Sequence, residues 1–296
     1  MKGRISGDFE SVNLRLVPIS LLPDVGFAQS SNVQKLQPDF TLSSIAPGRY
    51  RLEAEGQRKL EKGGFETLFA AMPVEVGATD LAGLDIAPQP AAAIELRFHE
   101  TEPGLAAAVT AVGLLPAMHA GPVVFAQEGN DKVRRFQPLR EGAYWLYTRT
   151  TGEKKVCITG AQLGDRDVFR QPVILTSGMN AQLTLTLSSH CAIITGRVVS
   201  NGQPAPGARI VVLPRGTPEN PGDSWSAFTD LQGGFELSDI AAGRYPIWAW
   251  QDDDSGLSVG PPDLASVAQL ATVVVVKEGD TAKSEISVLN LKERGK

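Results

Sequence analysis

The sequence predicts an all-β chain built from three tandem β-sandwich modules. Patterns with a helical period are scarce, whereas short alternating or β-branched runs are frequent and are separated by clusters of Gly, Pro, Asn and Asp. One phrase is also written twice, as Phe-Thr-Leu-Ser-Ser-Ile-Ala-Pro-Gly-Arg-Tyr over residues 40–50 and Phe-Glu-Leu-Ser-Asp-Ile-Ala-Ala-Gly-Arg-Tyr over residues 235–245. A shorter version occupies residues 136–144. The three versions are a domain length apart, which excludes a short-period solenoid.

A second repeated phrase supports the module boundaries. Gly3-Arg-Ile opens the first copy and Gly196-Arg-Val opens the third, at similar distances from the later phrase. We therefore expect modules at residues 1–90, 91–189 and 190–296, of which the middle one is the most diverged. The link expected near residues 87–92 is Pro-rich and semi-rigid, whereas the one near residues 188–191 is so short that the second and third modules are expected to touch.

Strand patterns justify the elements of each module in chain order. Alternating or β-branched runs predict strands at residues 12–17, 50–54, 94–98, 109–115, 181–187, 192–195 and 209–213. Residues 57–62 and 263–269 are the candidates for short surface helices, each of fewer than three turns.

The repeated phrase has a physical interpretation. Phe40 and Phe235 are expected to point inward as core anchors, and the glycine of the phrase is expected to supply backbone freedom at the turn. Tyr50 and Tyr245 then begin the return strand, with the ring over the core and the hydroxyl placed to bond backbone across the corner.

Several motifs of the third module resemble a known family. They are Gly196-Arg-Val-Val, Gly202-Gln-Pro-Ala-Pro-Gly-Ala208, Ile210-Val-Val-Leu-Pro214, Thr229-Asp-Leu-Gln-Gly-Gly-Phe235 and Ile240-Ala-Ala-Gly-Arg-Tyr245. They look like the carboxypeptidase regulatory-like domain, a transthyretin-like sandwich related to collagen-adhesin B-type repeats. The resemblance extends in weaker form to the rest of the chain. It implies three tandem transthyretin-like or immunoglobulin-like sandwiches that act as non-catalytic accessory modules at a bacterial cell envelope.

Composition excludes several classes of function. The 296 residues carry a formal net charge of −5, which argues against a general nucleic-acid-binding surface. No apolar run approaches the roughly 20 residues that a membrane span needs. The N-terminus shows no signal peptide, so either the protein is cytosolic or Met1 begins a fragment of a longer secreted chain. The family resemblance favours a periplasmic, cell-surface or extracellular location.

The chain has two cysteines, Cys157 and Cys191. They are too few and too far apart for a zinc knuckle. Two interpretations remain, which are one disulfide or two buried free thiols, and spacing alone does not choose between them.

No motif for catalysis or metal binding is present. His99, His119 and His190 lack a second ligand at the usual spacing, and the carboxylate run at residues 252–256 lacks the alternation of a calcium loop. Neither a nucleophile elbow nor a nucleotide-binding loop occurs. We therefore expect no enzymatic activity, cofactor or metal, although motifs alone do not reveal a dispersed active site.

The aromatic residues of the third module are the candidate ligand site. Trp248 and Trp250 share one face of a strand, and Trp225 lies nearby in the sequence. They form either part of the core or a platform on which sugar rings stack. The leading hypothesis is thus a structural or protein-interaction array, and the alternative is a carbohydrate-binding module. The expected partner is a protein or a cell-surface glycan.

Overall fold

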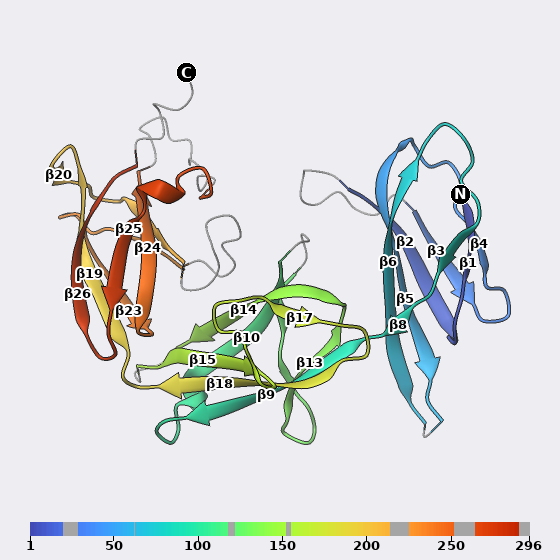
Figure 1. The fold of residues 1–296 in the computed structure, drawn as a ribbon, viewed down its shortest axis with the longest axis horizontal. Coiled ribbons are helices and arrows are strands. Elements are labelled where there is room, and N and C mark those ends of the chain that lie inside the picture. Colours follow the sequence, from blue (N-terminus) through green and yellow to red (C-terminus); the bar gives the residue numbers. More distant parts are fainter. Residues whose placement is uncertain are drawn as a thin grey trace. The chain divides into compact units, whose positions relative to one another are not determined.

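The computed structural model describes residues 1–19, 29–61, 63–117, 122–151, 155–213, 225–251 and 264–289. Within these ranges the regular structure is almost entirely β (Figure 1). The only helical elements described are two single 3-10 turns, Ala106–Ala108 and Ala268–Leu270. The predicted all-β class is therefore confirmed.

The chain divides into two compact units. The first comprises Met1–Ile94, Gln137–Gly142 and Ile174–Asn180, and the second comprises Glu95–Phe136, Ala143–Val173 and Ala181–Lys296. The described strands form six sheets, and each sheet takes its strands from one of three consecutive parts of the chain. We call these parts the first, middle and third stretches, and use the predicted boundaries 1–90, 91–189 and 190–296 for them. Whether each stretch folds as a separate module stays a prediction.

The first stretch supplies a three-stranded sheet, order β4-β1-β7, and a five-stranded sheet, order β3-β2-β5-β6-β8. Their strands are β1 (Lys2–Ile5), β2 (Ser11–Pro18), β3 (Gln29–Gln34), β4 (Asp39–Thr41), β5 (Gly48–Lys59), β6 (Phe65–Val76), β7 (Leu84–Ile86) and β8 (Gln89–Pro90). The helix expected at residues 57–62 is wrong where the structure describes it. β6 pairs with β5 as far as Lys59, so the ladder fixes an extended backbone there.

The middle stretch supplies a four-stranded sheet, order β11-β10-β14-β17, and a six-stranded sheet, order β12-β13-β9-β18-β15-β16. Their strands are β9 (Ala92–Glu100), β10 (Val109–Pro116), β11 (Val124–Phe125), β12 (Gln127–Glu128), β13 (Arg134–Leu139), β14 (Gly142–Thr150), β15 (Cys157–Leu163), β16 (Arg166–Asp167), β17 (Val173–Leu175) and β18 (Asn180–Ser188).

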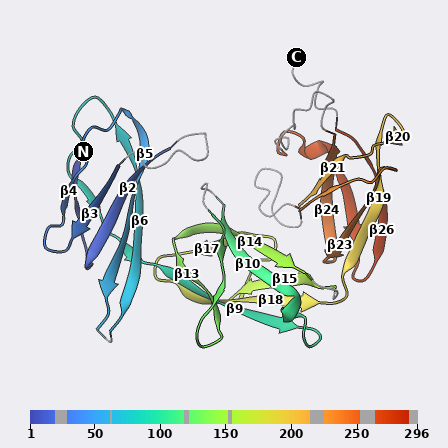
Figure 2. The same ribbon diagram turned by 180° about the vertical axis from the view of Figure 1, so that it is seen from behind.

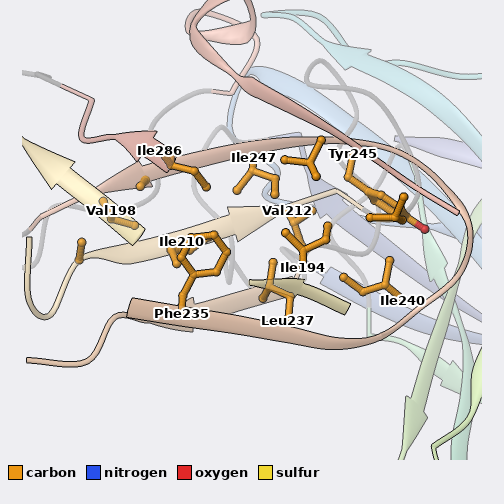
Figure 3. Close-up of a cluster of buried hydrophobic side chains, with 14 of the residues drawn as sticks. Ile194, Val198, Ile210, Val212, Phe235, Leu237, Ile240, Tyr245, Ile247 and Ile286 are labelled. Atoms are coloured by element: carbon orange, nitrogen blue, oxygen red, sulfur yellow. The ribbon is translucent and has the colours of Figure 1, made fainter. Parts of the chain in front are cut away.

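The third stretch supplies one sheet in which β19 lies between β23 and β26, with β20 at its edge, and a second sheet, order β22-β21-β24-β25. Its strands are β19 (Ala192–Ser200), β20 (Gln203–Pro204), β21 (Arg209–Val212), β22 (Trp225–Phe228), β23 (Gly234–Ile240), β24 (Gly243–Trp250), β25 (Thr272–Val276) and β26 (Thr281–Ser287). β21 and β24 can be followed side by side in Figure 2. Residues of both sheets point into one apolar core, which includes Ile194, Ile210, Phe235 and Ile247 (Figure 3).

The first and third stretches share one topology. β1 pairs antiparallel with β4 and parallel with β7, and β19 pairs antiparallel with β23 and parallel with β26. Gly3 and Gly196 occupy the same place in these two first strands. A Cβ atom on Gly3 would lie 2.6 Å from the Phe40 ring, and one on Gly196 would lie 2.8 Å from the Phe235 ring. The same Cβ atoms would lie nearer still to a carbonyl oxygen of the parallel strand, 2.5 Å from that of Leu84 and 1.9 Å from that of Ser284. The glycine that opens each copy therefore makes room for that backbone as well as for the aromatic anchor.

The predicted roles of the phrase are largely confirmed. Phe40 and Phe235 are buried, at 4% and 8% exposure. The hydroxyl of Tyr50 donates to the carbonyl of Ala46 at 2.8 Å, and the hydroxyl of Tyr245 donates to that of Ala241 at 2.7 Å. The same corner is thus closed by the same hydrogen bond in both stretches.

The role predicted for the glycine of the phrase is wrong at Gly48 and Gly243. In these two copies the left-handed backbone lies four residues earlier, at Ser44 with φ 56° and Asp239 with φ 57°, whereas Gly142 of the shorter version has φ 139°. Aspartate, as at Asp239, tolerates that conformation better than most residues do. At Gly243 the guanidinium of Arg170 lies close to the backbone, 2.0 Å from where a Cβ atom would stand.

Candidate functional site

The structure overturns the aromatic platform at Trp248 and Trp250. Their exposures are 1% and 0%, so neither ring offers a face to a sugar. Tyr245 and Ile247, which alternate with them on β24, point into the core between the two sheets. The two tryptophans point to the opposite side of the sheet, where they belong to a second apolar cluster.

This second cluster lies on the outer face of the sheet that contains β24. Its buried members are Val211, Leu213, Trp248, Trp250, Leu264 and Val267. The indole Nε1 of Trp248 donates to the carbonyl of Val267 at 3.1 Å. Residues 264–270 form turns and a 3-10 turn, in place of the longer helix expected at 263–269. They cover the outer face of the sheet, so both faces of β24 are buried.

Trp225 is not part of this cluster. It pairs with Val212 across β21 and β22 and packs, partly buried, against the core on the inner side. The three predicted ligand-binding tryptophans therefore lie on two opposite faces of one sheet, and the structure does not bring them together.

A disulfide joins Cys157 of β15 to Cys191, which precedes β19. The two Cα atoms are 5.6 Å apart, within the range that a disulfide needs. The bond therefore links the middle stretch to the start of the third. Since disulfides persist in oxidising compartments, this feature bears directly on where the protein works.

Arg170 contacts the repeated phrase close to this bond. Its guanidinium carbon lies 5.4 Å from the ring centroid of Tyr245, a cation–π distance. Its nitrogens also lie 3.4 Å from the carbonyl of Ala242 and 3.5 Å from that of Arg244. The contact expected between the second and third predicted modules is thus present, although sequence reasoning did not identify Arg170.

Asp239 lies at the same junction. It lines a small cavity of about 40 Å³ together with Cys157, Trp225 and Tyr245. Burial raises the pKa of the Asp239 carboxyl, and the charge of Lys155 and a hydrogen bond from the Val156 backbone oppose this effect without cancelling it.

His190 is flanked by two carboxylates. Its Nε2 is 3.6 Å from Glu102 and its Nδ1 is 3.4 Å from Glu278. The side chain of His190 is 68% exposed, as expected for a histidine in a solvated link. His99 is exposed on β9, and His119 and the carboxylate run at residues 252–256 lie outside the described residues. In the described part of the chain, no three His, Cys, Asp or Glu side chains are grouped to bind a metal.

The first unit holds a separate charged cluster on the five-stranded sheet. Glu53 is only 6% exposed and lies 2.5 Å from Arg51 and 3.0 Å from Arg140. Arg140 also lies 3.4 Å from Glu55 and 4.8 Å above the Phe69 ring. Burial raises the pKa of Glu53, but the hydrogen bonds and charges of Arg140 and Arg51 outweigh burial and hold the pKa below its usual value. Sequence reasoning missed this cluster because Arg140 is 87 residues away from Glu53.

An open groove of about 970 Å³ runs along β19, β23 and β26. Its lining is mixed in charge, with Arg197 and Lys283 beside Glu236 and Glu285. The lining holds neither histidine nor cysteine. Its chemistry is that of a solvated sheet surface.

No protein-family model matches the chain, and no curated protein matches it in sequence. Solved structures to which this chain is similar include the TIE protein of Bacillus anthracis, at 11% identity and TM-score 0.26, over 96% of this chain and 56% of that one. A streptococcal ancillary pilin is 12% identical with TM-score 0.26, over 98% of both chains. Two B repeats of the Staphylococcus aureus collagen-binding protein are 11% identical with TM-score 0.21, over 96% of this chain and 73% of that one. This chain spans about half the length of the first of these proteins.

No helix among the described residues is long and apolar enough to cross a membrane.

Three features of the described residues stand out chemically: the disulfide-linked junction around Asp239 and Arg170, the charged cluster around Glu53 and the buried cluster around Trp248. All three join strands or segments to one another.

Proposed function

We propose that the chain is a non-catalytic structural or protein-interaction array of a bacterial cell envelope or a secreted protein. In this proposal, residues 1–90, 91–189 and 190–296 are three sandwiches of the carboxypeptidase regulatory-like type. The shared pairing of β1 and β19, and the shared tyrosine corner, support a common module type for the first and third stretches.

The observation that carries the proposal is the disulfide between Cys157 and Cys191. A disulfide that joins two sandwich stretches suits an array that must keep its form outside the reducing cytosol. Arg170 supports the same role, because it contacts the phrase of the third stretch from the middle one. A protein partner is proposed in preference to a glycan, since the aromatic platform on which the glycan hypothesis depended is buried.

The thiol state in the native host tests this proposal. Cells are quenched in acid and their proteins are alkylated with a maleimide-polyethylene glycol, before and after reduction. We expect no labelling before reduction and two labels after it, with the protein in the envelope or culture fraction. The matched control is the double variant Cys157→Ser, Cys191→Ser, which should take no label in either case. Two free thiols in a cytosolic fraction would overturn the proposal.

A capture experiment tests the role itself. The intact chain is crosslinked to envelope extract and is also applied to a glycan and peptidoglycan array. A specific envelope protein among the crosslinked products supports the proposal. Retention on a glycan without any protein partner contradicts it, as does turnover of a hydrolase substrate.

A further inference from the structure

β25 is an edge strand that consists almost entirely of valine. Thr-Val-Val-Val-Val over Thr272–Val276 carries neither charge nor proline, and β24 is its only partner strand in the described part of the chain. Val274 and Val276 point into the core, whereas Val273 and Val275 are 41% and 62% exposed. An edge strand of this kind is a ready template for pairing with another chain.

The free side of β25 offers hydrogen-bonding groups at the same two residues. Residues opposite one another in an antiparallel ladder alternate between hydrogen-bonded and non-hydrogen-bonded pairs. Val273 lies opposite Pro246, which has no N–H and so takes a non-hydrogen-bonded pair. The N–H of Leu289 donates to the carbonyl of Ala249, so the hydrogen-bonding groups of Ala249 point to the β25 side of β24. Ala249 is three residues after Pro246, so this direction agrees with the alternation. The N–H and C=O groups of Val273 and Val275 therefore point away from β24.

The first stretch protects the matching strand, β6, which pairs with β8 only at Leu68 and Phe69 and has no other described strand on that side. In the shared register Val76 pairs with Gly48 as Val276 pairs with Gly243, so Pro73 and Glu75 stand where Val273 and Val275 stand. Both are exposed, as the two valines are. A proline removes a donor from the free side of an edge, and a charge opposes burial against another strand. The third stretch has neither device at these positions.

We infer that β25 pairs with β25 of a second copy of this chain. The occupant is argued from self-complementarity. In an antiparallel pair centred on Val274, Val273 of each copy lies opposite Val275 of the other, and these are the residues with free hydrogen-bonding groups. The two outward valines then cover each other on the same face of the joined sheet.

Charge favours the antiparallel arrangement as well. The charges next to β25 are Lys277 and Glu278, both at its C-terminal end. A two-fold axis through Val274 places the two charged ends at opposite ends of the interface. A parallel pair would instead bring like charges side by side. β26, the terminal strand of the opposite sheet, exposes Lys283 and Glu285 and is protected by them. This inference goes beyond the proposed function and depends on different residues.

Sedimentation equilibrium over increasing protein concentration tests the inference on the intact, oxidised chain. We expect a monomer that converts to a dimer below about 1 mM. Val275→Glu and Val273→Pro copy the protection of the first stretch, and each should raise the dimer dissociation constant by about tenfold or more. The control Leu231→Glu adds the same charge at another exposed apolar residue, 85% exposed, and should leave the constant unchanged. Circular dichroism verifies that every variant remains folded.

Amide exchange distinguishes this interface from any other dimer. Exchange at Val273 and Val275 should slow as the protein concentration rises, whereas exchange at Val274, which already bonds β24, should not change. A chain that stays monomeric to about 1 mM overturns the inference, even if a valine-rich peptide binds the edge. A dimer that leaves the amides of Val273 and Val275 unprotected, or that persists in both variants, overturns it too.

Discussion

In the first stretch, the outer face of β2 and β5 is charged: Arg15 lies opposite Glu53 in the ladder and 2.6 Å from Glu55. In the third stretch, β21 and β24 have the same register, with Val211 opposite Trp248. The inner faces of both pairs are apolar and closely matched, and include Leu14, Leu16, Leu52 and Ala54 in one and Ile210, Val212, Ile247 and Ala249 in the other.

This comparison separates the requirements of the fold from those of its surroundings. The inner face must be apolar, because each stretch needs a core between its two sheets. The residues of the outer face instead match the chemistry of the segment that packs on it. Arg140 meets carboxylates on the first stretch, and Leu264 and Val267 meet tryptophans on the third. The two stretches therefore differ on the outer face and agree on the inner one.

The largest effect is expected when one of the two tryptophans on the outer face of the third stretch is removed. Trp248→Ala should destabilise the second unit by about 3–5 kcal/mol, because it leaves a cavity beneath Val267. The other three tryptophans all lie in the second unit, so their fluorescence in a urea titration measures the loss. Leu231→Ala, at an exposed turn, is the control and should have little effect. An unchanged midpoint for Trp248→Ala would show that the outer cluster adds nothing to stability.

The disulfide distinguishes the third stretch from the first, which has no cysteine. Replacing both Cys157 and Cys191 with serine should cost about 3–4 kcal/mol, by the loop-entropy relation for a separation of 34 residues. Chemical denaturation of the oxidised and reduced wild type, beside the double variant, measures this cost. The reduced wild type should unfold like the variant. Equal stability of all three forms would contradict the expected role of the bond.

The charged outer face should respond to pH where the apolar one does not. Glu53→Gln should cost about 1–3 kcal/mol at pH 7, because it leaves Arg51 and Arg140 short of a buried partner. The pKa of Glu53 is lowered on folding, so this contribution is present above the ordinary glutamate pKa and is lost as the pH falls through the lowered value. Amide exchange in β5, followed from pH 7 into the acid range, should show the difference between the two proteins disappearing. A difference that is constant with pH would mean that the charge of Glu53 is irrelevant.

The smallest expected effect is at the matched left-handed residues, Ser44 and Asp239. The pKa of Asp239 is raised by burial, so the wild type loses stability as the pH rises from the ordinary aspartate value through the raised one. Asp239→Asn keeps a side chain suited to positive φ and should give a small rise in melting temperature at pH 7, with none in acid. Ser44→Asn is the control, and its effect should not depend on pH. A fall in melting temperature for Asp239→Asn at pH 7 would show that attraction to the charge of Lys155 outweighs burial.

The sequence predicted the scaffold well because the phrase repeats its physical roles. Phe40, Phe235 and the two corner tyrosines could be placed from alternation and spacing alone. The orientation of Trp248 and Trp250 was left open, since both alternating sets of β24 are apolar. Comparison with the first copy contained the answer: Glu53 and Glu55 stand at the same positions and face outward, so the tryptophans face outward as well.

What covers an outer face could not be predicted in the same way. Arg140 reaches Glu53 across 87 residues, and Val267 reaches Trp248 across 19. Arg140 belongs to the shorter version of the phrase and Val267 to a run of turns, and neither pattern indicates which residue the side chain contacts. The roles of Ser44 and Asp239 were missed for a related reason, since glycine is the residue expected at positive φ and it stands nearby in both phrases.

A chain pulled from its two ends does not load every residue equally. The bond between Cys157 and Cys191 passes tension directly between residues that are 34 positions apart, so the segment between them bears none while the bond is intact. At about 3.5 Å for each extended residue, this shields about 120 Å of chain from stretching. Reduction would release that length, so the redox state of two side chains sets how far the protein extends under force.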